Sequence, residues 1–227
     1  MTAESKAAVR SVKIPAGRVE LAGDLAVPAG ASALVIFAHG SGSSRFSPRN
    51  RFVAGVLNQA GFATLLFDLL TPAEEDLDRY SGRYRFDIPL LAARLEAATV
   101  WARQEPGLAD FKFGYFGAST GAAAALIAAA NRPEEVGAIV SRGGRPDLAA
   151  EYLDRVRAPT LLIVGGNDPI VLELNRQALR RFRCEARLEV IPGAGHLFEE
   201  PGALERVAEL ARDWFKTHLL GDRDRAG

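Results

Sequence analysis

The sequence is poor in cysteine and histidine and carries no excess of charge. Its single cysteine, Cys184, excludes a disulfide within the chain, and residues 1–10 lack the apolar core of a secretory signal. Lys and Arg number 28, as do Asp and Glu, and this balance favours neither a nucleic acid nor an anionic membrane as partner. The longest run of small apolar residues, 121–130, is too short to span a bilayer. We therefore expect a cytoplasmic protein that binds no nucleic acid and no membrane.

Short apolar runs alternate with amphipathic stretches along the chain, without a repeat or a linker. This alternation is typical of a mostly parallel β-sheet that helices cover on both faces. We expect a single α/β domain over residues 1–227 that opens with a hairpin of two strands. Strands are predicted at residues 9–14, 18–27, 33–38, 62–69, 111–116, 136–141, 160–164 and 188–191, and helices at 48–60, 87–104, 119–131, 147–155, 172–182 and 201–219.

The strongest local signal is a Gly-x-Ser-x-Gly pattern formed by Gly117, Ser119 and Gly121. It lies between an expected strand and an expected helix, which is the sequence context of a nucleophile elbow. A serine in so tight a turn needs small neighbours two residues away on either side, and its hydroxyl then projects above the sheet. The backbone N–H of Thr120 would point at an oxyanion that forms beside the serine. A Gly- and Ala-rich chain can contain this pattern by chance, so its meaning depends on the partners of Ser119.

A serine hydroxyl needs a base that removes its proton, and the chain has three histidines. His196 follows the last expected strand, where an α/β-hydrolase carries its base, because the chain order in that fold is serine, acid, histidine. His39 follows a buried strand and is expected to organise the next loop by hydrogen bonding, with a substrate contact as the alternative. His218 lies in the last helix and is expected to be a partly packed surface residue. His196 is therefore the predicted base.

The acid that orients such a histidine is expected between Ser119 and His196 in the chain. Asp168 meets this condition because it follows the strand at 160–164, although an Asp before a proline can also simply cap a helix. Asp68 is the rival acid, but it precedes the serine and breaks the chain order. The predicted catalytic triad is Ser119, Asp168 and His196.

The loop after the strand at 33–38 is rich in glycine and serine. Such a loop supplies the second oxyanion donor, for which the backbone N–H of Ser41 is the first choice and that of Gly42, also a candidate substrate contact, the second. Phosphate binding is the alternative for a glycine-rich loop. This loop lacks the third glycine of a dinucleotide fingerprint and the Gly-Lys-Ser/Thr of a P-loop, which argues against nucleotide binding.

With these motifs the chain resembles the dienelactone-hydrolase-like branch of the α/β-hydrolase superfamily. The resemblance extends over residues 19–219, and its carriers are residues 37–51, 114–121, 140–148, 164–168 and 192–201. It implies the α/β-hydrolase fold and an enzyme that cleaves a small carboxylic ester through an acyl-enzyme on Ser119, without a metal or an organic cofactor. Dienelactone hydrolases proper carry a cysteine nucleophile, whereas position 119 is serine. The serine favours ordinary ester chemistry over dienelactone as the natural substrate.

The surroundings of the site are expected to be open. Only one short helix fits between the strand at 136–141 and Pro159, so no large lid domain interrupts the sheet there. Residues 70–86 are expected to form the rim of the pocket, and their acidic run at 74–78 lacks calcium-loop spacing and is expected to be solvated. Arg142 is a candidate partner of a substrate carboxylate, and structural ion pairs are the alternative for Arg142 and Arg145.

Other functions are compatible with the same motifs. A triad of this kind also carries acyl transfer, perhydrolysis and thioester cleavage, which the sequence does not separate from ester hydrolysis because water exclusion and pocket shape decide among them. A hydrolase-like module that binds a small molecule or a protein without catalysis is the alternative from another class. Such a module would not need all three residues of the predicted triad. The sequence leaves both a monomer and a homodimer open.

Overall fold

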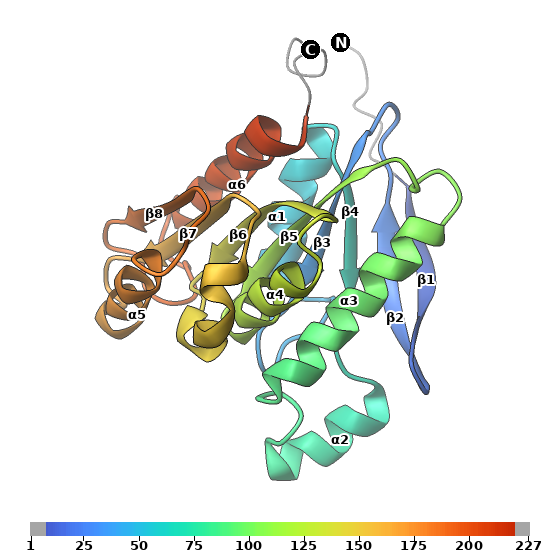
Figure 1. The fold of residues 1–227 in the computed structure, drawn as a ribbon, viewed down its shortest axis with the longest axis horizontal. Coiled ribbons are helices and arrows are strands. Elements are labelled where there is room, and N and C mark those ends of the chain that lie inside the picture. The colour runs from blue at the N-terminus through green and yellow to red at the C-terminus, as the bar shows by residue number, and fades with distance from the viewer. Residues whose placement is uncertain (1–7, 221–227) are drawn as a thin grey trace.

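The computed structural model describes residues 8–220, in which eight strands form one sheet in the order β1-β2-β4-β3-β5-β6-β7-β8 (Figure 1). The strands are β1 (Val9–Ala16), β2 (Val19–Ala26), β3 (Ala33–Ala38), β4 (Ala63–Phe67), β5 (Lys112–Ala118), β6 (Val136–Arg142), β7 (Thr160–Gly165) and β8 (Ala186–Ile191). β1 and β2 form an antiparallel hairpin, and β2 also runs antiparallel to β4. The strands β4, β3, β5, β6, β7 and β8 are parallel to one another, which confirms the expected mostly parallel sheet.

Helices cover both faces of this sheet (Figure 1). They are α1 (Pro48–Gln59), α2 (Pro72–Ser81), α3 (Ile88–Gln104), α4 (Thr120–Asn131), the 3₁₀ helix η1 (Pro146–Arg155), α5 (Pro169–Leu179) and α6 (Ala203–Leu219). The buried residues of α1 and α6 belong to the core on one face, and those of α3, α4 and η1 belong to the core on the other. The helix predicted at 172–182 begins three residues earlier, because Asp168 caps it and Pro169 occupies its first turn.

The segment at 70–86 contains a helix, α2, that the sequence analysis did not predict. Its start is a capping box, in which the Thr71 hydroxyl accepts the Glu74 N–H and the Glu74 carboxylate accepts the Thr71 N–H. Glu74 also pairs with Arg94 of α3 at 2.8 Å, and Asp78, which is 3% exposed, accepts hydrogen bonds from the Arg85 side chain. The expectation of a wholly solvated acidic run was therefore wrong, since two of its carboxylates are partners of arginines.

Helix α4 is buried on every side, which explains why its sequence is small and apolar all round. Two glycines allow its first turn to lie against the sheet. A Cβ added to Gly121 would lie 2.2 Å from the carbonyl oxygen of Ala38, and one added to Gly117 would lie 2.4 Å from the Cα of Ala122. This close approach brings the N-terminus of α4 to the carboxyl ends of the central parallel strands.

No helix within residues 8–220 is long and apolar enough to cross a membrane. Residues 1–7 and 221–227 lie outside the described part of the chain. Most of residues 1–10, which the sequence analysis considered for a secretory signal, lie outside the described part, and so do both ends of the domain predicted over residues 1–227. The lack of a signal and the bounds of the domain therefore stay predictions.

The packing of α4 predicts that replacing Gly121 with alanine greatly lowers the yield and the thermal unfolding midpoint of the protein. The added methyl group would collide with two backbone carbonyl oxygens, those of Ala38 and His39. Gly55→Ala is the matched control, because Gly55 is an exposed residue of α1 with nothing within 4 Å of its added Cβ. This control is expected to gain up to about 1 kcal/mol from helix propensity. A Gly121→Ala protein that unfolds at the wild-type temperature in circular dichroism would contradict the close packing.

Candidate active site

Ser119 occupies the sharp turn between β5 and α4. Its φ of 51° is a left-handed conformation that residues other than glycine seldom adopt. Backbone hydrogen bonds hold this turn from both sides. The Ser119 N–H donates to the carbonyl of Arg142 at 3.1 Å, and the Ser119 carbonyl accepts from the N–H groups of Ala122 at 3.1 Å and Arg145 at 3.2 Å. A strained serine held in this way between strand and helix has the backbone geometry that the Gly-x-Ser-x-Gly pattern predicts.

His196 and Asp168 meet at the carboxyl edge of the sheet. The Nδ1 atom of His196 lies 2.6 Å from Oδ2 of Asp168. The other carboxylate oxygen of Asp168 accepts the N–H of Val171 at 3.4 Å, where α5 begins. Helix capping and orientation of a histidine were alternatives for Asp168 in the sequence, and one carboxylate makes both contacts, each with a different oxygen.

Two glycines allow close contacts within the site: Gly40 lies against Ser119, and Gly143 lies against His196. A Cβ added to Gly40 would lie 3.1 Å from the Cβ of Ser119, and one added to Gly143 would lie 3.4 Å from Cε1 of His196. Among the described residues, the Ser119 hydroxyl and the His196 imidazole are not hydrogen-bonded to each other. Such contacts are often loose without substrate and tighten in the substrate complex.

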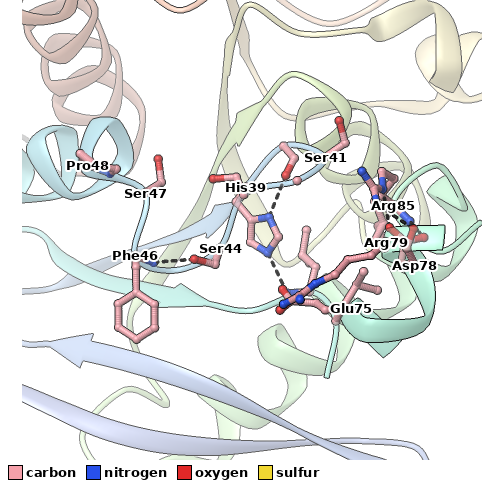
Figure 2. Close-up of a pocket in the computed structure, with 16 residues that line it drawn as sticks. His39, Ser41, Ser44, Phe46, Ser47, Pro48, Glu75, Asp78, Arg79 and Arg85 are labelled. Carbon is pink, nitrogen blue, oxygen red and sulfur yellow. Dashed lines mark hydrogen bonds and ion pairs between the residues drawn. The ribbon is translucent and has the colours of Figure 1, made fainter. Parts of the chain in front are cut away.

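His39 is buried and ties the loop after β3 to the end of β4. Its Nε2 accepts the N–H of Leu69 at 3.0 Å, and its Nδ1 lies 2.9 Å from the carbonyl oxygen of Gly40 (Figure 2). Because Nε2 is an acceptor, the ring is the neutral tautomer whose Nδ1–H donates to Gly40. Burial lowers the pKa of His39, although the Gly40 hydrogen bond and the charge of Asp68 act in the opposite direction. His39 thus organises the loop as expected, and its ring also lines a pocket.

Asp68 holds a second point of the same loop. One carboxylate oxygen accepts the backbone N–H of Arg45 at 2.8 Å, and the other pairs with the Arg45 guanidinium. Arg45 also lies 3.7 Å from Asp24 of β2. Asp68, the rival acid in the sequence, is therefore the partner of an arginine, and the carboxylate that His196 contacts is Asp168.

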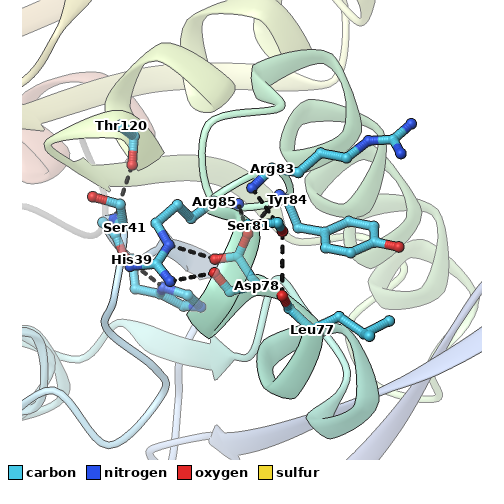
Figure 3. Close-up of polar contacts among 10 residues, drawn as sticks. His39, Ser41, Leu77, Asp78, Ser81, Arg83, Tyr84, Arg85 and Thr120 are labelled. Carbon is cyan, nitrogen blue, oxygen red and sulfur yellow. Dashed lines mark hydrogen bonds and ion pairs between the residues drawn. The ribbon is translucent and has the colours of Figure 1, made fainter.

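Ser41 and Thr120, whose backbone N–H groups are the two predicted oxyanion donors, are hydrogen-bonded to each other. The Ser41 N–H donates to the Thr120 hydroxyl oxygen at 2.9 Å (Figure 3). Without substrate the Ser41 N–H is therefore engaged by a side chain from 79 residues further along the chain, and its role as an oxyanion donor stays a prediction. Gly42 has a φ of 70° in a turn that the Ser43 N–H closes by donating to the Gly40 carbonyl. The Thr120 N–H lies in the first turn of α4, where N–H groups have no partner within the helix.

A pocket of about 560 Å³ opens beside this loop (Figure 2). Residues 39–44 and 46–48 form one side of it, with Leu69, Leu70 and Leu91 as further apolar lining. The opposite rim is polar, and its residues come from α2 and the turn that follows. They are Glu75, Asp78, Arg79 and Arg85. The segment at 70–86 therefore lines this pocket. Ser119, Asp168 and His196 are not among the lining residues, so a rim of the catalytic pocket at 70–86 stays a prediction.

The two arginines after β6 have different surroundings. Arg145 donates two hydrogen bonds to the Asp147 carboxylate, at 2.9 and 2.7 Å, and so makes the structural ion pair considered in the sequence analysis. Arg142 is 7% exposed and pairs with no carboxylate within residues 8–220, and its buried Nε lacks a partner. Its guanidinium lies 5.9 Å from the centre of the Phe198 ring. Burial lowers the pKa of Arg142 to about 10, and the nearby charge of Arg49 acts in the same direction.

Comparisons with known proteins point to one family. The sequence model of the "Dienelactone hydrolase family" matches residues 21–219. The crystal structure of a dienelactone hydrolase from Anabaena variabilis is similar over 95% of this chain and 100% of that chain, with 57% identity and a TM-score of 0.93. The Pyrococcus furiosus esterase Pf2001 is 19% identical, with a TM-score of 0.73 over 94% of each chain, and shares the fold.

A curated protein of Mycobacterium tuberculosis, strain H37Rv, is 59% identical over 210 residues and is provisionally named a phosphoribosyl transferase. The match covers 92% of this chain and 46% of that protein. The chain therefore spans about half the length of the curated relatives it matches.

The neutral ring of His39 predicts a pH-dependent contribution to stability. Because burial lowers its pKa below the value in the unfolded chain, unfolding takes up a proton at acid pH. The contribution is complete above about pH 6.5 and declines as the pH falls through that value. The free energy of unfolding in urea is therefore expected to differ more between wild type and His39→Asn at pH 7.5 than at pH 5. An equal difference at both pH values would contradict the buried neutral tautomer.

Proposed function

The chain belongs to the dienelactone hydrolase family, and we propose that it is a serine hydrolase that cleaves small carboxylic esters through an acyl-enzyme on Ser119. The observation that supports this most directly is the 2.6 Å contact between His196 and Asp168 at the sheet edge where Ser119 occupies its left-handed turn. Serine, acid and histidine follow one another in the chain order of an α/β-hydrolase triad.

In the proposed reaction, His196 accepts the Ser119 proton while the hydroxyl attacks the ester carbonyl. Asp168, on the Nδ1 side of the ring, stabilises the imidazolium that forms. The N-terminus of α4 favours the negative charge of the tetrahedral intermediate, and the Thr120 N–H donates to its oxygen. His196 then protonates the leaving alkoxide, and a water molecule that the same ring activates releases the acyl group. These steps use the side chains of the triad, the Thr120 N–H at the N-terminus of α4, and water.

Acyl transfer and thioester cleavage use the same triad and are the alternative enzymatic reactions to ester hydrolysis. The His196 side chain is 38% exposed, so water reaches the ring that would activate it. This exposure favours hydrolysis over transfer to a second substrate, because transfer requires that water be kept away from the acyl-enzyme.

The name of the M. tuberculosis relatives describes proteins about twice the length of the matched segment. The Anabaena dienelactone hydrolase is matched over 100% of its own chain at 57% identity. This match to a whole hydrolase chain favours a hydrolase for the present chain. The loop after β3 also lacks the dinucleotide fingerprint and the P-loop sequence that would favour nucleotide binding.

We expect wild-type protein to hydrolyse p-nitrophenyl acetate and butyrate, and Ser119→Ala to lose turnover by as much as about 10⁶-fold, the loss seen when a serine protease loses its nucleophile. Asp168→Asn is expected to lose about 10⁴-fold, because the ring is then held in the wrong tautomer. Ser11→Ala is the control, since Ser11 is an exposed residue of β1.

An organophosphonate probe separates this enzyme from a non-catalytic binding module. It is expected to label wild type and Ser11→Ala, and to leave Ser119→Ala unlabelled. Turnover that survives in Ser119→Ala would refute the mechanism, and a wild-type protein that is neither active nor labelled would support the binding module.

Arg142 supports a preference for esters whose acyl group also carries a free, negatively charged carboxylate. Within residues 8–220 it is a buried cation without a counter-ion, and it directly precedes Gly143, against which His196 packs. An arginine in such a place binds a carboxylate with charge-assisted hydrogen bonds. Burial without a counter-ion also costs stability, which a bound anion would offset.

Arg142→Met is expected to lower kcat/KM for p-nitrophenyl hydrogen succinate, relative to p-nitrophenyl butyrate, about tenfold or more, the value of a hydrogen bond to a charged group. The same variant is expected to unfold at a higher temperature, because it removes an unpaired buried charge. Arg145→Met is the control, since the Arg145 guanidinium is already paired with Asp147. An unchanged ratio between the two esters in Arg142→Met would exclude the carboxylate contact.

A further inference from the structure

The Ser41 N–H is directed at the Thr120 hydroxyl. The two heavy atoms lie 2.9 Å apart, which is an ordinary length for a hydrogen bond from an amide to an oxygen. An N–H group that already points at one good acceptor does not make a second strong hydrogen bond in another direction. For the Ser41 N–H to bind a substrate oxyanion, the oxyanion must therefore displace the Thr120 hydroxyl, unless the oxyanion binds the hydroxyl itself or the N–H of Gly42.

The Thr120 hydroxyl has an unused proton. A threonine hydroxyl carries one donor and two acceptor sites, and this one uses an acceptor site for Ser41. Within residues 8–220 its proton has no hydrogen-bond acceptor, and the residue is only 3% exposed. The residue that directly follows Ser119, at the N-terminus of α4, therefore carries a hydroxyl donor without a partner in the described part of the chain.

The loop that carries Ser41 is anchored on both sides of it. His39 binds the N–H of Leu69 before Ser41, and Arg45 binds the carboxylate of Asp68 after it. Displacing the hydroxyl would break its hydrogen bond with Ser41 at the moment of reaction, which would cost free energy. A donor that is already held in place needs no such reorganisation, which is the condition under which an oxyanion hole is most effective.

We propose that the Thr120 hydroxyl is a catalytic donor of the oxyanion hole. It accepts the Ser41 N–H and donates its own O–H to the substrate oxyanion, beside the backbone N–H of the same residue. The proton stays on the threonine oxygen, and Ser41 acts through the hydroxyl as a positioning residue that polarises it. This inference rests on the proposed serine hydrolase and assigns the second donor of that same site.

The test compares Thr120→Val, which keeps the shape of the side chain without its hydroxyl, with Thr120→Ser, which restores the hydroxyl. For p-nitrophenyl acetate, the valine variant is expected to lose kcat by about 10²-fold, as when one oxyanion donor is removed, with KM changed by less than threefold. The serine variant is expected to recover most of this loss. Thr120→Ala replaces the valine variant if valine does not fold.

Thr99→Val is the matched control, because it also removes a buried threonine hydroxyl, one that belongs to α3 and lies 2.6 Å from the Tyr115 hydroxyl. It is expected to lower the unfolding midpoint and leave kcat unchanged, so it separates loss of a donor from loss of stability.

Wild-type kcat in the valine and alanine variants would overturn the role of Thr120 and leave the backbone N–H groups of Ser41 and Gly42 as the candidates for the second donor. Ser119→Ala is measured in parallel. If it is inactive while Thr120→Val is fully active, only the role of Thr120 fails. If Ser119→Ala stays active, the proposed hydrolase fails and the role of Thr120 fails with it.

Discussion

The close approach of α4 to the sheet is the constraint on which the candidate site depends. No Cβ fits at Gly117 or Gly121, because each would collide with backbone atoms of a neighbouring element. The helix therefore begins directly where β5 ends, and Ser119 is left in the left-handed conformation between them. Backbone hydrogen bonds to Arg142 and from Arg145 hold this strained turn. The position of the serine is thus a consequence of backbone packing.

The parallel sheet then gathers the other groups around the serine. Parallel strands end at one edge, so the loops after β3, β5, β6, β7 and β8 meet there although they are far apart in the chain. The charges at this edge are mostly balanced. His39 is neutral, Asp68 is paired with Arg45, and Asp168 contacts His196. Arg142 pairs with no carboxylate within the described residues, and this missing counter-ion is the feature that supports the proposed anionic substrate.

Much of the fold was predictable because burial leaves a periodic pattern in the sequence. The apolar runs gave the strands of the sheet, and Gly-x-Ser-x-Gly with the chain order of acid and histidine indicated the proposed triad. The helix α2 was missed because its residues are mostly polar and its apolar periodicity is short. Its capping box at Thr71 and Glu74 is a local signal that the sequence does contain.

The sequence by itself determined the kind of fold, the order of the functional loops and the identity of the candidate nucleophile, acid and base. These depend on local patterns of burial, turn chemistry and spacing, which a linear chain records. Only the tertiary structure decided that the Thr120 hydroxyl accepts the Ser41 N–H and that Arg142 has no counter-ion within the described residues. Hydrogen bonds and ion pairs form over about 3 Å between segments that can be many residues apart, so their partners are set by how the segments pack and not by the order of the residues.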